Sequence, residues 1–262
     1  MAILKKFRGI RFPLRIALAL LLGYTIFFGK ATFFVWQARH DAATHPIWAI
    51  VPVALSDTSV SSARGSTLTK FGYQFDVPWK MREAKAVEGI AFFRADSGQE
   101  TLEFWDPAIQ TGLVEIMRDS NEVARNAMTL FYGSKFVQSD YAFEQAVLNT
   151  TPSQLSYFWP GKKDVRAAVL LMMKPIGIPE SSTGIYSFET ENLRGFQSGN
   201  PAKAGSVTVK AFDAQDRQFL FIWGTNPKST GWLTQADINL VLHTLRPAPI
   251  EKSEASDKFA TK

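Results

Sequence analysis

An apolar run near the N-terminus constrains this chain more than any other feature. Residues 16–36 carry apolar side chains almost throughout, with Lys30 as the charged interruption. As a helix, these 21 residues would measure about 31 Å, which matches the roughly 30 Å hydrocarbon core of a bilayer. Lys30 is near enough to the far end for its amine to reach the headgroups. The sequence therefore predicts a single transmembrane helix over 16–36.

Basic residues precede this run and predict its orientation. The first fifteen positions contain no Asp or Glu, and their basic residues are Lys5, Lys6, Arg8, Arg11 and Arg15. The positive-inside rule places this tail in the cytoplasm. We therefore expect a single-pass protein of the inner (plasma) membrane whose main domain is periplasmic or otherwise extracytoplasmic. Cations and Trp favour the headgroup region, so the predicted membrane-interface residues are Arg15, Lys30, Trp36 and Arg39.

Two other interpretations of this segment stay open. A signal peptide would have the same basic and apolar regions, and Gly29-Lys30-Ala31 could serve as its cleavage site. The apolar run continues past Ala31, which favours an uncleaved anchor. A buried helix of a soluble protein is the third interpretation, although such helices rarely carry a basic flank. Both leading interpretations export the domain.

The distribution of charge and the absence of cysteine exclude several classes of function. The five charges of the tail equal the net charge of +5, so residues 16–262 are neutral. A neutral domain lacks the positive surface that binds nucleic acid phosphates, and we expect no nucleic acid partner. Without cysteine, disulfides, thiolate metal sites and a Cys nucleophile are all excluded.

The remaining sequence predicts a connector, one folded domain and a charged tail. The connector covers 37–66, with a flexible loop over 57–67, and a disordered tail covers 249–262. Alternating patterns predict strands at 71–77, 90–94, 101–105, 185–190, 207–213 and 218–223. Helical patterns predict helices over 113–131, 140–148, 151–158, 164–174 and 234–245. Val123 falls on the predicted buried face of the first. Thr151 is the predicted N-cap of the third, and Thr234 with Asp237 the predicted cap of the last. Periodicity does not separate helix from strand at 164–174, where Ala, Leu and Met favour helix.

This order of elements predicts an α+β domain over 67–248, in which helices cover an antiparallel sheet. Two short segments add a resemblance. The chain resembles PsbP-type α/β domains in its opening strand, which runs into Val77-Pro78-Trp79, and in a closing helix that runs into Leu245-Arg246-Pro247. The resemblance implies a role in binding or assembly, and it transfers no functional residue to this chain.

The sequence contains no recognisable catalytic or metal-binding pattern. The three histidines do not form a group in the sequence. His40 and His45 lie in the connector, and His243 lies on the polar side of the last predicted helix. Asp213 and Asp216 are expected to form a turn, and the acidic residues near 119–122 and 189–191 are expected to be solvated. We therefore predict no catalytic, cofactor or metal residue.

Aromatic residues are abundant, with 21 Phe, 7 Trp and 6 Tyr. Trp79, Trp159 and Trp232 adjoin Pro or Gly at the ends of predicted elements, where side chains are often partly exposed. Exposed aromatic residues are favoured at protein interfaces. These three are the candidate partner contacts, and packing in the core is the alternative for each.

These observations favour a non-catalytic accessory or assembly protein. Its anchor over 16–36 would contact membrane lipid, and its extracytoplasmic domain would bind a membrane or envelope protein, with no cofactor. Two alternatives stay open. One is an envelope hydrolase that works with paired carboxylates, and the other is a lipid- or solute-binding domain with an apolar cavity.

Overall fold

The computed structural model describes most of the chain beyond the N-terminal tail. The described residues are 29, 32–44, 46–97, 100–110, 112, 114, 118–156, 160–178, 182, 184–202, 206–224 and 233–249. They form two compact units. The first takes in the described residues of 1–51, 121–138 and 142–180, and the second those of 52–120, 139–141 and 181–262. Most of the predicted transmembrane helix and of the charged tail lies outside the described residues.

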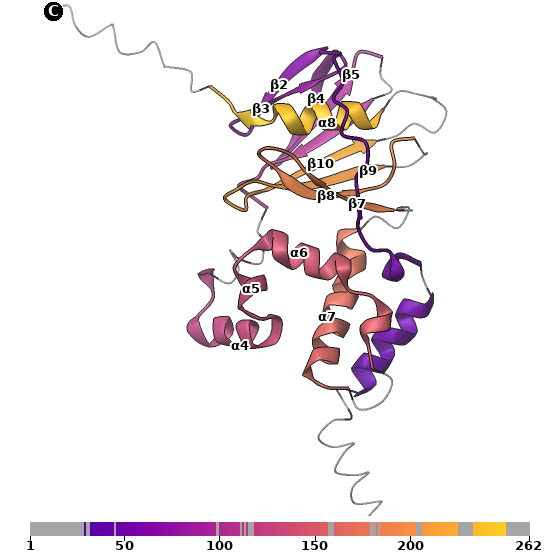
Figure 1. The fold of residues 1–262 in the computed structure, drawn as a ribbon. Coiled ribbons are helices and arrows are strands. Elements are labelled where there is room, and N and C mark those ends of the chain that lie inside the picture. Colours follow the sequence, from indigo (N-terminus) through magenta and orange to yellow (C-terminus); the bar gives the residue numbers. More distant parts are fainter. Residues whose placement is uncertain are drawn as a thin grey trace, which may run out of the picture. The chain divides into compact units, whose positions relative to one another are not determined.

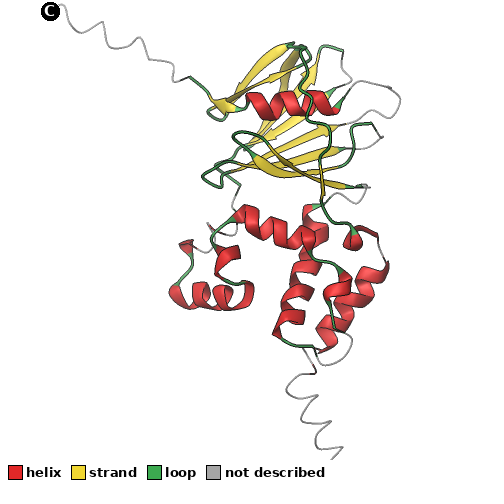
Figure 2. Cartoon of the chain, viewed as in Figure 1, coloured by secondary structure: helices red, strands yellow, loops and turns green. Residues whose placement is uncertain are grey.

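The second unit is built on two sheets (Figures 1 and 2). The larger has the order β1-β7-β8-β9-β10-β6-β5-β4, and it is antiparallel except where β1 pairs with β7. Its strands are β1 (Val53–Ala54), β4 (Met81–Val87), β5 (Ile90–Ala95), β6 (Thr101–Trp105), β7 (Ile185–Glu189), β8 (Arg194–Ser198), β9 (Val207–Phe212) and β10 (Gln218–Gly224). The smaller has the order β11-β3-β2, from β2 (Ser66–Lys70), β3 (Tyr73–Val77) and β11 (Arg246–Pro247).

Aromatic side chains join the two sheets of this unit. Phe75 on β3 meets Phe104 on β6 and Phe221 on β10 edge to face, with ring centroids 5.2 and 5.4 Å apart. Phe104 and Phe221 are cross-strand partners whose rings stack at 4.8 Å. All three are fully buried. Alternation along β10 explains this arrangement, because every second side chain of a strand points to the same face.

Helix α8 (Gln235–Thr244) completes the core of the second unit. Ile238, Val241 and Leu242 are buried in the same apolar cluster as Phe75. At its N-terminus the Thr234 hydroxyl accepts from the Asp237 N–H at 3.2 Å, and the Asp237 carboxylate accepts from the Thr234 N–H at 3.0 Å. This capping box is the one predicted from Thr234 and Asp237. At its C-terminal end the Thr244 hydroxyl accepts from the Asp76 N–H at 2.9 Å.

The predicted flexible loop is irregular in structure but is bonded to α8. Asn239 donates its side-chain amide to the carbonyl oxygens of Asp57 and Ser59, at 3.0 and 2.7 Å. The Ser61 N–H donates to the Ala236 carbonyl at 3.0 Å. Because Asn239 is itself buried, these bonds satisfy a polar side chain that would otherwise be costly to bury. The loop ends in β2, a strand that the sequence did not reveal.

Several strands differ from their predicted bounds, for physical reasons. Phe71 and Gly72 have positive φ values of 52° and 76° and form a turn, so β3 begins at Tyr73. Strand β4 was not predicted because its side chains after Met81 are all exposed. Strand β8 was not predicted because it contains Gly195, a residue type that is uncommon in strands. Glycine is required there, because a Cβ atom would lie 2.1 Å from the Lys210 carbonyl oxygen of β9.

The first unit is helical. Residues 32–44 form a helix, followed by η1 (Pro46–Ala49), α4 (Glu122–Tyr132), α5 (Ser134–Val137), α6 (Asp140–Asn149), η2 (Pro152–Gln154) and α7 (Lys162–Gly177). The first two residues of α6 belong to the second unit. Among the described residues, no helix has the length and apolar character needed to cross a membrane.

The helical predictions for this unit have mixed outcomes. The preference for helix over strand at 164–174 is confirmed by α7. The predicted buried face of the helix over 113–131 is wrong at Val123, whose side chain is 78% exposed in α4. The predicted N-cap position of Thr151, with Pro152 following it, is confirmed. The predicted α-helix over 151–158 is wrong, because the Thr151 side chain makes no capping bond and the element is a 3₁₀ turn of three residues.

Lys174 on α7 is the most deeply buried charged residue that the structure describes, with no exposed surface. Its amine donates to the Thr150 carbonyl at 2.9 Å and to the Trp48 carbonyl at 3.3 Å, so it joins three segments of the first unit. Burial disfavours the ammonium form and lowers the pKa of Lys174 to about 8. The hydrogen bonds satisfy the amine, while its charge opposes folding.

Removal of the α8 cap provides a test of the second unit. Thr234→Ala deletes a hydroxyl that both accepts from and donates to Asp237. We expect the free energy of unfolding to fall by about 1 kcal/mol. The matched control is Thr151→Ala, which removes a hydroxyl with no capping bond and should change stability by less than about 0.5 kcal/mol. Urea unfolding followed by circular dichroism measures both. Equal losses in the two variants would contradict the assigned cap.

The buried amine predicts that stability increases at alkaline pH. Between pH 8 and pH 10.5 the unfolded chain keeps the Lys174 proton while the folded chain has lost it. The free energy of unfolding should therefore rise with pH over this window, by roughly 3 kcal/mol at most. Lys174→Met should remove this rise, and Lys135→Met, at an exposed position of the same unit, should preserve it. Urea unfolding at intervals across the window is the measurement, and parallel profiles for all three proteins would refute the assignment.

Candidate functional site

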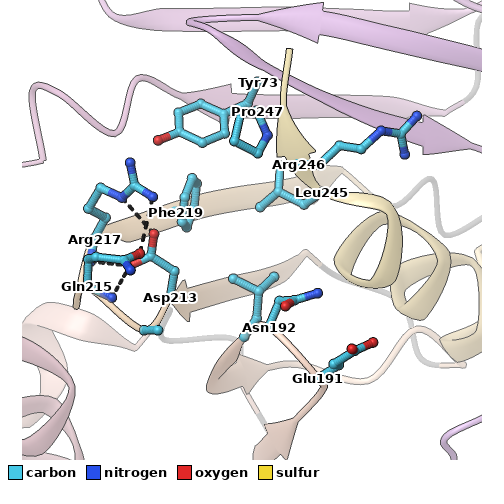
Figure 3. Close-up of a pocket in the computed structure, with 12 residues that line it drawn as sticks. Tyr73, Glu191, Asn192, Asp213, Gln215, Arg217, Phe219, Leu245, Arg246 and Pro247 are labelled. Atoms are coloured by element: carbon cyan, nitrogen blue, oxygen red, sulfur yellow. Dashed lines mark hydrogen bonds and ion pairs between the residues drawn. The ribbon is translucent and has the colours of Figure 1, made fainter. Parts of the chain in front are cut away.

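The second unit contains an open pocket of about 440 Å³ where several strand ends and turns converge (Figure 3). Tyr73 comes from the start of β3. The turn over 191–193 joins β7 to β8, and the turn over 213–217 joins β9 to β10. Residues 245–247 form the last wall, from the end of α8 into β11. The pocket is thus assembled from segments that are far apart in the sequence.

One wall of the pocket is apolar. The Tyr73 ring meets the Phe219 ring edge to face, with centroids 5.0 Å apart. Phe219, Leu193 and Leu245 are buried in the core of the unit, while Tyr73 is half-buried and packs against that core. These side chains are already positioned by packing, so a ligand that covered them would order few additional groups. Because Phe219 is 2% exposed, a ligand would reach the half-buried Tyr73 ring, which Phe219 supports from the core.

A turn closed by Asp213 forms the polar side. The Asp213 carboxylate accepts from the N–H groups of Gln215 and Arg217, both at 2.9 Å. Asp216 in the same turn has φ 64°, a left-handed conformation that Asp tolerates better than most residues. The predicted role of Asp213 and Asp216 as turn formers is confirmed.

Arg217 is the cation of this turn. Its Nε donates to the Asp213 carboxylate at 2.6 Å, and its guanidinium lies 5.8 Å from the centroid of the Tyr73 ring. The hydrogen bond that Arg217 donates to Asp213 raises the pKa of Arg217 above its ordinary value. The guanidinium is therefore always charged. Its Nη2 also donates to the Gln215 side-chain oxygen at 3.4 Å, and the group lies near the tyrosine ring (Figure 3).

Asp216 has different partners and bonds to the start of α6. Its carboxylate accepts from the Ser139 hydroxyl at 3.1 Å, the Tyr141 N–H at 3.3 Å and the Asp140 N–H. Arg194 lies 3.8 Å from the same carboxylate and 4.2 Å from the centroid of the Tyr141 ring. A carboxylate at a helix N-terminus stabilises the unpaired N–H groups there. Asp216 therefore fixes the turn that carries Arg217.

The remaining charged residues line the rim. Arg246 donates to the Thr244 carbonyl at 3.1 Å, and its Nε lies 2.6 Å from the side-chain oxygen of Gln74 when that amide is oriented to accept. Glu191 is exposed. The described lining includes no His, Ser, Thr, Lys or Cys. Of its two carboxylates, that of Asp213 is already bound to Arg217. A nucleophile paired with a base is thus not among the described lining residues, whereas contacts for a bound group are present.

The predicted interface and partner residues have different locations. Trp36 is 60% exposed on the helix over 32–44. Arg39 on the same helix is half-buried and donates to the Leu155 carbonyl at 2.6 Å, so it holds this helix to the first unit. Trp79 is half-buried against the core of the second unit. Arg15, Lys30, Trp159 and Trp232 lie outside the described residues.

The other polar candidates are solvated, as expected. His243 is exposed on α8, and His40 is exposed on the helix over 32–44, while His45 lies outside the described residues. Asp119, Glu122, Glu189 and Glu191 are also exposed. No group of three potential metal ligands occurs within the part of the chain that the structure describes.

Sequence reasoning missed the pocket residues Tyr73, Arg217 and Phe219. Tyr73 and Phe219 each belong to predicted strands, and their pattern indicated core positions without indicating that they would meet. A signal was present in the turn, because Asp213 and Arg217 flank a tight connection at a spacing that permits an ion pair. The location of that turn opposite β3 depends on tertiary structure.

Comparison with known proteins adds no assignment: no family model, curated protein or solved structure matches this chain.

Proposed function

We propose that this chain is a non-catalytic, membrane-anchored accessory or assembly protein whose extracytoplasmic domain binds a membrane or envelope protein. The observation that carries the proposal is the pocket of the second unit. It combines the half-buried Tyr73 ring, which Phe219 supports from the core, with a guanidinium at Arg217 that is held in place by Asp213. Aromatic residues and Arg are the residue types most often responsible for binding energy at protein interfaces.

The N-terminal sequence supports the membrane part of the proposal. Residues 16–36 form an apolar run of bilayer length behind a basic tail. We propose that this run anchors the protein in the inner membrane with its N-terminus in the cytoplasm. The α+β domain, with its mostly antiparallel sheet, would then lie on the periplasmic side. The PsbP-type resemblance agrees with a role in assembly.

The pocket chemistry supports binding over hydrolysis. A carboxylate hydrolase needs one carboxyl group that can give up or take a proton. Asp213 already accepts two backbone N–H groups and the Arg217 guanidinium, so its oxygen atoms are engaged in holding the turn. The ion pair therefore suits recognition of a fixed partner group.

A small-molecule ligand is the second candidate, on one specific observation. The pocket volume of about 440 Å³ falls within the range of about 300–1,000 Å³ that is typical of ligand sites. Its apolar wall would cover a ring or short acyl group. Native mass spectrometry of the purified protein would separate this candidate from protein binding, because a bound solute adds a defined mass. Phe219→Leu should reduce the fraction of protein that carries this added mass.

Site-specific photocross-linking in native membranes tests the partner proposal. Ala214→benzoylphenylalanine places the probe at an exposed position that lines the pocket. We expect a single protein adduct, whose yield falls roughly tenfold when Arg217→Gln is added, corresponding to about 1.4 kcal/mol of binding. Mass spectrometry of the adduct identifies the partner.

The matched control is Lys85→benzoylphenylalanine, at an exposed position on edge strand β4 that does not line the pocket. It should give little of the same adduct. Equal yields at positions 85 and 214, or a yield at 214 that does not change with Arg217→Gln, would contradict recognition through the pocket.

A further inference from the structure

The helix over 32–44 has two opposite faces. Val35, Ala38 and Ala42 are 2%, 1% and 6% exposed, and they pack into the first unit. Phe33 and Trp36 are 62% and 60% exposed, and His40 is exposed as well. At about 100° per residue, Phe33, Trp36 and His40 fall within an arc of about 60° that lies opposite the buried residues. We call these three residues the aromatic face.

The aromatic face is a continuous surface. The rings of Phe33 and Trp36 have centroids 6.2 Å apart, and those of Trp36 and His40 are 5.6 Å apart. Single exposed apolar residues are common on soluble proteins, but contiguous exposed apolar surface marks a contact with a membrane or a partner. The neighbouring exposed rings of Phe33 and Trp36 therefore indicate a surface that a membrane or a partner covers.

Polarity increases along the helix. After Phe33 and Trp36 the same side carries His40, whose Nδ1 lies 3.6 Å from the Asp41 carboxylate. Thr44 follows, with its hydroxyl donating to the Asp41 carbonyl at 2.6 Å. The apolar end of this face is thus the end nearest the apolar run over 16–29 in the sequence. A helix that leaves a bilayer has this gradient, because Phe and Trp prefer the boundary and ionisable groups prefer water.

The dimensions of a bilayer agree with this gradient. The polar headgroup layer on each side of the hydrocarbon core is about 5–8 Å thick. Along a helix, Trp36 lies about 4.5 Å beyond Phe33, and Thr44 lies about 16 Å beyond it. If the hydrocarbon core ends just before Phe33, residues 16–32 cross it, a length of about 17 residues at the short end of the range for a spanning helix. The first two aromatic residues then fall within the headgroup layer and Thr44 lies in water.

We infer that the aromatic face is a membrane-contact surface, with Phe33 and Trp36 seated in the headgroup layer of the bilayer that holds the proposed anchor. The inference rests on the anchor in the proposed function and deepens it, because Phe33 and Trp36 lie at the end of the apolar run over 16–36 and are assigned here to the headgroup layer. The same helix is fixed to the first unit by its buried face and by the Arg39 bond to the Leu155 carbonyl. The membrane-contact surface therefore lies on a helix that is packed against the first unit.

The absence of cysteine from the sequence permits a direct test on the full chain. Single variants Phe33→Cys, Trp36→Cys, His40→Cys and Thr44→Cys are each labelled with an NBD fluorophore. The labelled proteins are reconstituted in vesicles of phosphatidylethanolamine and phosphatidylglycerol with doxyl-labelled lipid. We expect quenching at positions 33 and 36 to exceed that at position 44 by roughly twofold or more, with a blue-shifted emission, because interfacial helices bury one face by about 5–10 Å.

Lys135→Cys is the matched control, an exposed position on α5 of the same unit, and its label should remain unquenched. Circular dichroism of each labelled protein verifies that the fold is intact. Uniform quenching from 33 to 44, or quenching at 33 and 36 no stronger than at 135, would overturn the inference.

The outcome separates the two proposals. Resistance of the full chain to carbonate extraction reports the anchor itself, and the adduct at position 214 reports the partner. A chain that remains in the membrane with an unquenched aromatic face refutes the membrane contact and leaves the anchor standing. A graded quenching pattern without the adduct supports the contact and counts against partner binding through the pocket.

Discussion

Packing of Phe75 against Phe104 and Phe221 is the interaction on which the second unit depends. The three rings come from strands of two different sheets, and their contacts join those sheets into one core. Each ring buries a large apolar area, and edge-to-face geometry adds a favourable electrostatic term. Helix α8 reaches the same cluster through Ile238 and Val241. This cluster packs β3 and α8 against the larger sheet.

The pocket is a consequence of that packing. Tyr73 begins the strand that carries Phe75, and Phe219 lies two residues before Phe221 on β10, so the contact between the two strands also brings Tyr73 and Phe219 together. The turn after β9 then supplies Arg217 and Asp213 at the edge of this aromatic pair. The pocket thus lies where the core reaches the surface, so its apolar side chains are positioned by core packing.

Local signals predicted those parts of the structure that local physics controls. The capping box at Thr234 and Asp237 follows from side chains three residues apart, and the hairpin of β5 and β6 follows from two alternating segments around a turn. Local signals failed where distant contacts decide the outcome. Val123 has a helical apolar spacing yet is exposed, and β8 contains Gly195 and the fully buried Gln197, whose amide is satisfied by Gln235 of α8. A buried polar residue of this kind cannot be recognised before its partner is known.

The sequence by itself determined the apolar run over 16–36, the neutral charge of everything after the basic tail, the absence of thiol chemistry and the α+β order of elements. These properties depend on composition and on short-range periodicity, which need no folded neighbour. Tertiary structure alone decided that Tyr73, Phe219 and Arg217 meet in one pocket. It also decided that the helix over 32–44 buries Val35 and exposes Phe33 and Trp36. Which face of a helix or strand meets another element depends on contacts between residues that are distant in the chain, and those contacts form only when the core assembles.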